Sequence, residues 1–542
     1  MSKKKLGIFG WFFLGFIALS QAQTEDKPFI SPAVVTDYVQ KFNQKDNELY
    51  KQFIPNNEAG DFLAQRIPRF ECPDKELEEI FYFRFWTYRK HIKQTPDGYV
   101  ITEFLPAVQW SEKYNAIPCA AMFHFNEGRW LNSPEFLNSY AYFWLRGGVG
   151  LRSYSFPIAH TLYNYYLTTG NDSLILDLLP DLIANYEAWV KERRDANGLF
   201  WQIGNSDGME MSVAASLLNT DEHYRATINS YLFAEAHAIS LIARHAGKPE
   251  IAERFHKEAE YIRRLLYTKL WDDKTGFYKV APRVKNPETP LTLVDVHELH
   301  GYTPWFAEAL IPPKKQTIAW KQLFDTQGFY APFGPTTAEQ RHPGFKIAYE
   351  GHECQWNGPS WPYATSITLI GLANLLNNQK QNIVGKNEYF DLLQIYAHSQ
   401  HLTKEDGTVV PWIDENLNPF TGDWISRTRL KTWQNGTWSA EKGGVERGKD
   451  YNHSEFCDLV ITGLAGIRPQ EGKKLTVNPL IPADKWDYFC LDNLHYQGHQ
   501  LVVVYDKYGT KYNRGKGLMV FVDGILQAKS NKIQKLTVSL FS

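Results

Sequence analysis

Apolar residues recur at helical spacing through most of the chain. From Leu77, the positions Ile80, Phe81, Tyr88 and Ile92 fall on one face of a helix. The same pattern predicts further helices at 174–190, 231–243, 251–270, 361–376 and 389–398. Less regular apolar spacing indicates others at 136–145, 156–167, 305–311, 318–324 and 456–467. We therefore expect about eleven or twelve helices.

The segments between these helices are rich in turn residues and hold no long strands. The run Asp-Ala-Asn-Gly occupies 195–198, and Asp-Asp-Lys-Thr-Gly at 272–276 precedes the short strand-like pair Phe277 and Tyr278. Successive helices without long strands exclude a TIM barrel or a Rossmann sheet. Helices in an even number, joined by alternating short and long loops, fit six hairpins closed into an (α/α)6 barrel. A helical solenoid would give a similar pattern, although no fixed-period repeat is present.

The pattern changes after Pro469. Short segments rich in apolar and β-branched residues at 475–477, 501–505, 518–522 and 536–540 predict strands, and therefore a small C-terminal β-domain. The segment before residue 70 is mixed and polar, and predicts only an extension packed on the barrel. The expected organisation is mainly α: a signal peptide at 1–22, an N-terminal extension at 23–70, a catalytic (α/α)6 barrel at 71–470 and the β-domain at 471–542.

The first residues are typical of a secretory signal peptide. Three lysines precede an apolar run from Leu6 to Leu19 and a small-residue stretch that ends at Ala22. The apolar run is shorter than the ~20 residues that a membrane-spanning helix needs. We expect a mature protein that begins near Gln23, is periplasmic or secreted, and is not attached to a membrane.

Charge and cysteine content exclude several classes of partner. The 58 lysines and arginines nearly balance the 60 aspartates and glutamates, so no basic surface for nucleic acid is expected. The five cysteines show no metal-ligand spacing, and an odd number cannot all pair within the chain. The histidines show no such spacing either. We expect no metal and no cofactor, at most one disulfide is indicated, and nothing in the sequence indicates an oligomeric state.

Aromatic residues are abundant and often lie in loop-like sequence. They make up 15% of the chain, with 17 tryptophans, and many stand beside Gly, Pro or Asn. A pyranose presents C–H groups that stack on an aromatic face, so this placement favours a sugar-binding cleft. The alternative for any single aromatic residue is that it fills the core, because each buries a large area.

Two carboxylates in aromatic loops are candidates for acid and base catalysis. Hydrolysis of a glycosidic bond requires a proton donor and, in the inverting route, a carboxylate that activates water. Asp207 lies in a turn that follows Trp201, and Glu415 lies in a loop that begins at Trp412. Asp414 and Asp423 compete with Glu415, and an ordinary acidic turn remains the alternative for each candidate.

Two further segments combine residue types that bind sugars. The run at 355–363 fixes its backbone with Gly and Pro, so that Trp356 and Trp361 can present rings while Asn357 offers a hydrogen bond. A second run, at 125–130, combines the carboxylate of Glu127 with Arg129 and Trp130, a mixture suited to vicinal hydroxyls. A capped helix start and a surface salt bridge are the respective alternatives.

Taken together, these segments resemble glycoside hydrolase family 63 and its bacterial mannosylglycerate-hydrolase-like relatives. The similarity covers roughly residues 75 to 470, and the string Trp-Asn-Gly-Pro-Ser-Trp-Pro at 356–362 is its most specific part, with support from 416–422 and 451–460. The resemblance implies a six-hairpin fold and inversion at α-glycosides, with Asp207 as the general acid and Glu415 as the general base. Because the chain lacks the usual Asp-Asn-Ser-Pro string at the acid, Glu210 is the alternative acid.

The expected function is therefore that of an exported, exo-acting and inverting glycosidase whose partner is an oligosaccharide or glycan. One rival is another enzyme of the same fold, a sugar epimerase or polysaccharide lyase, in which His237, His297, His453 or a tyrosine moves the proton. A second rival is a glycan-binding protein without catalysis. Facing carboxylates across a Trp-lined pocket would favour hydrolysis over both.

Overall fold

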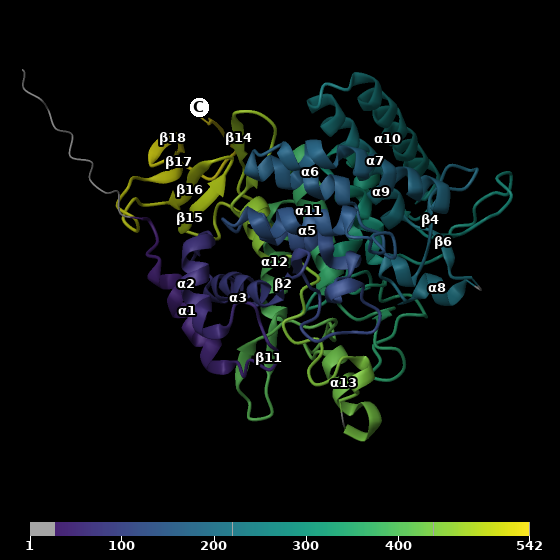
Figure 1. Cartoon of the computed structure of the whole chain (residues 1–542), viewed down its shortest axis with the longest axis horizontal. Helices are drawn as coiled ribbons and strands as arrows, with labels where there is room; N and C mark the ends of the chain where they lie inside the picture. The colour runs from purple at the N-terminus through teal and green to yellow at the C-terminus, as the bar shows by residue number, and fades with distance from the viewer. Residues whose placement is uncertain (1–27, 219, 437, 541–542) are drawn as a thin grey trace, which may run out of the picture.

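The computed structural model describes residues 28–218, 220–436 and 438–540 (Figure 1). The signal peptide predicted at 1–22 lies outside these ranges. The described chain is mainly helical, and most of its longer strands gather in the C-terminal part, which is yellow in Figure 1. The prediction of a mainly α protein with a small C-terminal strand region is confirmed.

The helices agree with the apolar pattern wherever that pattern was regular. The α-helices are α1 (Ala33–Lys45), α2 (Asn56–Arg66), α3 (Lys75–His91), α4 (Ala121–Gly128), α5 (Pro134–Arg146), α6 (Ile158–Thr169), α7 (Ser173–Arg193), α8 (Val213–Leu217), α9 (Ala226–His245), α10 (Pro249–Lys269), α11 (Pro362–Asn378), α12 (Lys386–Ser399) and α13 (Ile425–Gly436).

Three predicted helices take other helical forms. The segments around 305–311 and 318–324 are the 3₁₀ helices η4 (Leu299–Trp305), η5 (Glu308–Leu310) and η6 (Lys314–Phe324). Pro304 lies inside η4, and a proline lacks the N–H that a regular α-helix needs. The segment at 456–467 holds a π-helix, η8 (Leu459–Leu464).

Burial separates inner helices from outer ones. Nearly every side chain of α4, α9, α11, η4 and η8 is buried, whereas α7 and α10 keep one exposed face. The inner helices contact one another in series, from α4 to α6, α9, η4, α11 and η8, and α3, α7, α10 and α12 each pack against a member of this series. The core therefore lies among helices that the outer helices cover.

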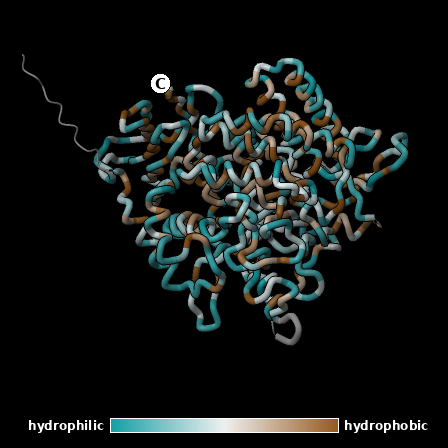
Figure 2. Tube along the Cα trace, viewed as in Figure 1, coloured by the Kyte–Doolittle hydropathy of each residue, from teal (hydrophilic) through white to brown (hydrophobic). Residues whose placement is uncertain are grey.

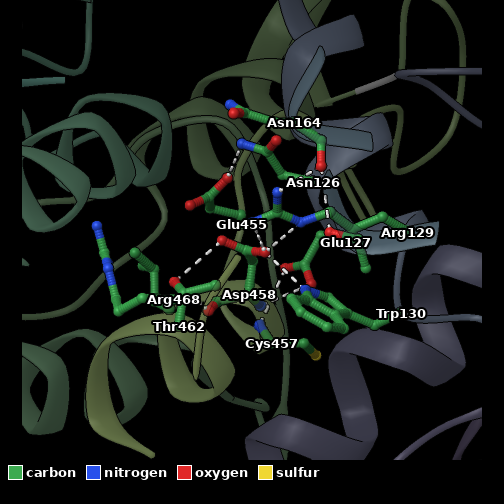
Figure 3. A network of polar contacts seen from close by, with 12 residues as sticks. Asn126, Glu127, Arg129, Trp130, Asn164, Glu455, Cys457, Asp458, Thr462 and Arg468 are labelled. Carbon is green, nitrogen blue, oxygen red and sulfur yellow. Dashed lines mark hydrogen bonds and ion pairs between the residues drawn. The ribbon is translucent and has the colours of Figure 1, made fainter. Parts of the chain in front are cut away.

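A carboxylate at the end of α4 joins the first inner helix to the last. Glu127 is buried and accepts hydrogen bonds from the backbone N–H groups of Phe456, Cys457 (3.0 Å) and Asp458 (3.2 Å), at the start of η8 (Figure 3). The first N–H groups of a helix have no partner within it, so this carboxylate satisfies them. The series of inner helices thus begins and ends in contact.

The C-terminal strands form two antiparallel sheets. The larger has the order β1 (Arg69–Glu71), β15 (Tyr488–Tyr496), β16 (His499–Asp506), β17 (Gly517–Val522) and β18 (Ile525–Ser530), and the smaller has β13 (Ile467–Arg468), β14 (Lys474–Val477) and β19 (Leu536–Ser539). The edge strand β1 comes from the N-terminal part of the chain, next to α1 and α2, which pack on α3. Figure 2 shows both hydrophobic and hydrophilic stretches in this region.

The remaining strands are short and shape the loops. They are β2 (Ile92–Thr95), β3 (Gly98–Ile101), β4 (Trp201–Ile203), β5 (Met211–Ser212), β6 (Glu222–Tyr224), β7 (Trp271–Asp272), β8 (Phe277–Tyr278), β9 (Ala281–Pro282), β10 (Gln355–Trp356), β11 (His401–Thr403) and β12 (Val409–Pro411). The strand-like pair predicted at Phe277 and Tyr278 is β8.

Three structural observations concern the expectations about a membrane-spanning helix, a metal site and disulfides. Among the described residues, no helix combines the length and apolarity needed to cross a membrane. Within the same ranges, no three His, Cys, Asp or Glu side chains gather in a way that could hold a metal ion. All five cysteines are described, and each is a free thiol.

Candidate active site

One cavity, of about 230 Å³, gathers carboxyl groups and aromatic rings beside the segments that lead into α4, α9, α11 and η8. Its lining includes the carboxyl groups of Glu103, Glu210, Glu353 and Glu415, the rings of Phe104, Trp110, Tyr154, Trp356, Trp361, Tyr363 and Tyr451, the cations Lys442 and Arg447, the thiols Cys119 and Cys354, and the imidazoles of His352 and His453. We call this the acid cavity.

The segment 355–361 holds the two acid loops together. Its strand β10 pairs in parallel with β5, which directly follows Glu210. On the other side, Ser360 exchanges two backbone hydrogen bonds of 3.0 Å with Leu417, two residues after Glu415. The string that carries the family resemblance is therefore the structural bridge between Glu210 and Glu415.

The same segment forms an aromatic wall. The rings of Trp356 and Trp361 stack with centroids 4.1 Å apart and planes 10° from parallel. The indole N–H of Trp361 donates to the carbonyl of Gln355 (2.7 Å), which closes the loop. Gly358 allows the close approach of a neighbouring loop, because a Cβ there would lie 2.3 Å from the carbonyl oxygen of Lys346.

Glu210 is the acid nearest to this wall. Its Oε2 accepts a hydrogen bond of 2.9 Å from the indole N–H of Trp356. Withdrawal from bulk water raises the pKa of Glu210 to about 7, and the negative charge of Glu415 acts in the same direction. Glu210 therefore keeps its proton to a higher pH than an ordinary glutamate does.

The electrostatic environment of Glu415 differs from that of Glu210, because a positive charge lies next to it. Its carboxylate forms an ion pair with Arg447, and both side chains are almost fully buried. The thiol of Cys354 lies 3.9 Å from Oε2 of Glu415. The carboxylate of Glu415 thus lies against a buried positive charge.

Asp414 contacts the backbone of Glu415 and does not line the acid cavity. Its Oδ1 accepts hydrogen bonds from the backbone N–H of Glu415 (2.8 Å) and the hydroxyl of Ser426 (2.9 Å). Asp423, the other rival, bonds to the hydroxyl of Thr428 outside the cavity. Of the three acids that the sequence left open in this loop, Glu415 is the one that reaches the cavity.

Asp207 lies close to Glu210 in sequence but not on the cavity wall. It ends the short 3₁₀ helix η3 (Asn205–Asp207), is buried, and accepts a hydrogen bond from the hydroxyl of Thr227 at the start of α9. Burial raises its pKa to about 6, while the charge of Arg225 opposes the rise. The geometry therefore places Glu210, not Asp207, in the acid cavity.

Three residues expected to bind sugar lie together outside the acid cavity. Glu127 bonds to the start of η8, and Arg129 forms a buried ion pair with Asp458 at 2.6 Å (Figure 3). The indole N–H of Trp130 donates to the same carboxylate oxygen over 2.6 Å. This network links α4 to η8. Of the three predicted residues, Arg129 is the one that lines a cavity, a separate one of about 410 Å³.

The other expected sugar contacts are also dispersed. The face of Trp201 is covered by the guanidinium of Arg283, 3.8 Å from the ring centre. Asn357 flanks the aromatic wall, and its backbone carbonyl accepts the N–H of Lys346 (2.9 Å). Trp412 lines a third cavity of about 510 Å³. Of the predicted site residues, the structure brings Glu210, Trp356, Trp361 and Glu415 together.

The histidines are divided among different places. His453 lines the acid cavity beside Tyr451, with ring centres 3.9 Å apart, and burial lowers its pKa well below the usual range. His237 lines the separate cavity that Arg129 reaches, and Nδ1 of His297 lies 3.2 Å from a carboxylate oxygen of Glu339. The acid cavity is dominated by carboxyl groups, so the geometry favours carboxyl chemistry over the histidine alternatives.

Several lining residues gave no interpretable signal in the sequence. Glu103 follows β3 and accepts a hydrogen bond from the hydroxyl of Tyr451, and Arg447 pairs with Glu415. Burial raises the pKa of Glu103 to about 8. Tyr451 begins a run that contributes to the family resemblance, but nothing in the sequence indicates that its hydroxyl meets Glu103.

A mainly helical fold with an indole wall and two carboxyl groups in different electrostatic environments is typical of carbohydrate-active proteins. Residues 113–454 match the model of the mannosylglycerate hydrolase MGH1-like glycoside hydrolase domain, and the chain belongs to this six-hairpin glycosidase family. The resemblance seen in the sequence is thereby confirmed. Residues 467–526 match the C-terminal domain of glycosyl hydrolase family 65, which agrees with the separate strand region.

Known proteins share this fold over most of the chain. A solved structure named "Sialidase" is 37% identical, with a TM-score of 0.85 over 94% of this chain and 45% of that one. The GH78 family rhamnosidase of Bacillus sp. GL1 is 12% identical, with a TM-score of 0.52 over 81% of this chain and 40% of that one. An uncharacterized protein of Borreliella burgdorferi is 23% identical over 40% of this chain and 43% of its own. The chain thus spans less than half the length of these relatives.

Proposed function

We propose that the protein hydrolyses glycosidic bonds by inversion, with Glu210 as the general acid and Glu415 as the general base. The observation that carries this proposal is the meeting of both carboxyl groups in one Trp-walled cavity. Glu210 has a pKa near neutrality, and Glu415 is paired with Arg447. Asp207, the first choice from the sequence, has no place in the mechanism because it lies off the cavity wall.

In this mechanism the proton and electron pairs move in one displacement. Glu210 donates its proton to the glycosidic oxygen as the bond from that oxygen to the anomeric carbon breaks. Glu415 accepts a proton from water, whose oxygen bonds to the anomeric carbon from the opposite face. The products are an alcohol and a sugar of inverted anomeric configuration, and proton exchange with solvent restores both carboxyl groups.

The size of the cavity supports release of a terminal sugar. Its volume of about 230 Å³ is below the roughly 300–1,000 Å³ typical of pockets for drug-sized ligands. Such a space suits one ring on the Trp356 and Trp361 wall better than an internal stretch of polysaccharide. We therefore propose exo action on an oligosaccharide or glycan, with α-linkage as the family resemblance implies.

We further propose that the inner and outer helices close into an (α/α)6 barrel. The inner series α4, α6, α9, η4, α11 and η8 supports this, because each member contacts the next and Glu127 links α4 to η8. The acid cavity would then lie at the end of the barrel where the inner helices begin. The lysines and apolar run at the start of the sequence support export to the periplasm or medium.

The test is a hydrolysis screen with three matched variants. Purified protein is incubated with α-linked mannosides, glucosides and rhamnosides and with sialylated glycans, the last because one similar structure carries the name "Sialidase". Released sugar is measured by chromatography, and NMR of fresh product reports the anomeric configuration. Glu210→Gln and Glu415→Gln should each lower turnover by at least about 100-fold, whereas Asp207→Asn should retain most of it.

The outcomes separate the assignments. Loss of activity in Asp207→Asn but not in Glu210→Gln would return the acid role to Asp207. A product that retains its configuration would overturn the inverting mechanism. Binding of these sugars without release by the parent would favour the glycan-binding alternative.

A further inference from the structure

A third carboxyl group of the acid cavity has no role in the displacement above. Glu103 follows β3 and is 4% exposed, and its backbone carbonyl accepts the N–H of Asn452 (3.1 Å). Its Oε1 accepts a hydrogen bond from the hydroxyl of Tyr451. Its Oε2 has no hydrogen-bond partner among the described residues, although it is fully buried. Burying a carboxyl oxygen without a hydrogen-bond partner costs free energy, so we expect a bound ligand to supply the partner of Oε2.

We propose that Glu103 binds the substrate, with Oε2 forming a hydrogen bond to an oxygen atom of the sugar held in the acid cavity. This inference rests on the proposed function. Glu103 lines the same cavity as Glu210, Glu415 and the Trp356 ring. Since Tyr451 occupies Oε1, the oxygen that remains for a ligand is Oε2.

The charge of the site indicates the form in which Glu103 binds. Burial raises its pKa to about 8, and the negative charges of Glu415 and Glu210 add to the rise, while Tyr451 and Arg447 oppose it. Cys119, Tyr140 and Tyr154 also interact electrostatically with Glu103. At neutral pH the proton is on Oε2, because Tyr451 donates to Oε1. Glu103 is then a hydrogen-bond donor to a sugar oxygen. Because it is neutral in this form, it adds no second negative charge next to Glu415.

Two substitutions test this role. Glu103→Gln places an amide N–H₂ donor where Oε2–H stood, and we expect it to keep KM within about threefold of the parent. Glu103→Leu removes the donor, and we expect KM to rise about 10-fold to 100-fold, as for loss of one buried hydrogen bond. Glu187→Gln, on the exposed face of α7, controls for the glutamate-to-glutamine change. Thermal unfolding of each variant separates loss of folding from loss of binding.

The pH profile supplies a readout that a purely structural role would not change. In the parent, ionisation of Glu210 near pH 7 and of Glu103 near pH 8 should both reduce kcat/KM. The alkaline limb of the plot of log kcat/KM against pH should therefore reach the slope expected for loss of two protons. In Glu103→Gln the limb should show one proton. A two-proton limb in Glu103→Gln, or an unchanged KM in folded Glu103→Leu, would overturn the proposal while leaving hydrolysis by Glu210 and Glu415 intact.

A different measurement is needed if the parent releases no sugar, because that result overturns the proposed function without testing the role of Glu103. Binding of D-mannose, D-glucose and L-rhamnose, measured by calorimetry, then decides: binding equal in parent and Glu103→Leu overturns the role of Glu103, and binding weakened by Glu103→Leu supports it.

Discussion

The indole N–H of Trp356 donates a 2.9 Å hydrogen bond to Oε2 of Glu210. One residue of the aromatic wall therefore also lowers the pKa of the proposed acid, against the larger opposing effect of burial. The pairing of β5 with β10 fixes this contact, because it holds the backbone after Glu210 beside Trp356. Trp356 thus belongs both to the aromatic wall and to the electrostatic environment of Glu210.

Replacing Trp356 with Phe should move the alkaline limb of the pH profile to higher pH. The indole N–H stabilises the ionised form of Glu210 and lowers its pKa, so its loss raises that pKa further above about 7. Since the protonated acid is the active form, the limb should shift upward by about half a unit to one unit. The measurement is kcat/KM against pH.

Trp361→Phe is the matched control for this shift. It also loses an indole N–H from the stacked pair, but that group donates to the carbonyl of Gln355 rather than to an acid. Its alkaline limb should stay in place while KM rises. An equal shift in both variants would show that the wall, not the hydrogen bond, governs the pKa of Glu210.

Gly448→Ala should impair catalysis through the base. A Cβ at this position would lie 1.9 Å from Oδ1 of Asp414, and that atom orients the backbone of Glu415. Displacement of Glu415 by about 1 Å should lower kcat by about 100-fold. Gly60→Ala, where the added Cβ meets only ordinary contact at 3.7 Å, should keep full activity. Parental kcat in a folded Gly448→Ala protein would argue against this role of Asp414.

A polar face made some helices easy to recognise in the sequence. The helices α7 and α10 have exposed and buried sides, so their apolar periodicity was readable. In α4 all eight residues are buried, which leaves no alternation to detect. The strand β15 was missed because its register shifts between Leu491 and Leu494 and interrupts the period of two.

The site was predictable where its residues lie within one string. Trp356 and Trp361 were found because they are close in sequence and flank Gly and Pro. Glu103 was not, because its partner Tyr451 is 348 positions away, and no local pattern encodes such a contact. The choice between Asp207 and Glu210 depended on which side chain faces the cavity, and the turn at Gly208 decides that direction in three dimensions.

Stability should fall as pH rises because of buried carboxyl groups, and Glu235→Gln should reduce this dependence. Burial raises the pKa of Glu235 to about 8, whereas in the unfolded chain it ionises near 4.5. The folded state therefore holds a proton that the unfolded state releases, so the stabilisation present at low pH is lost between about pH 5 and about pH 8.

The amide of Glu235→Gln can still accept the N–H groups of Ala159 and His160 but does not ionise. Its unfolding temperature, followed by calorimetry across this pH range, should decline less than that of the parent. Glu187→Gln should decline as the parent does, because Glu187 is about half exposed. Identical slopes for Glu235→Gln and the parent would contradict the buried-proton account.

Arg129 provides a direct contrast between a sugar clamp and a structural ion pair. Its guanidinium pairs with Asp458 at 2.6 Å, with both side chains under 10% exposed. Arg129→Met would leave a buried carboxylate without its partner, and should cost about 3–5 kcal/mol of unfolding free energy. Arg254→Met, which breaks an exposed pair with Glu187, should cost under about 1 kcal/mol. Urea unfolding measures the two losses of stability. In folded Arg129→Met, KM should stay at the parental value, because Arg129 lies outside the acid cavity. A raised KM with little loss of stability would instead restore the sugar-binding role that the sequence predicted.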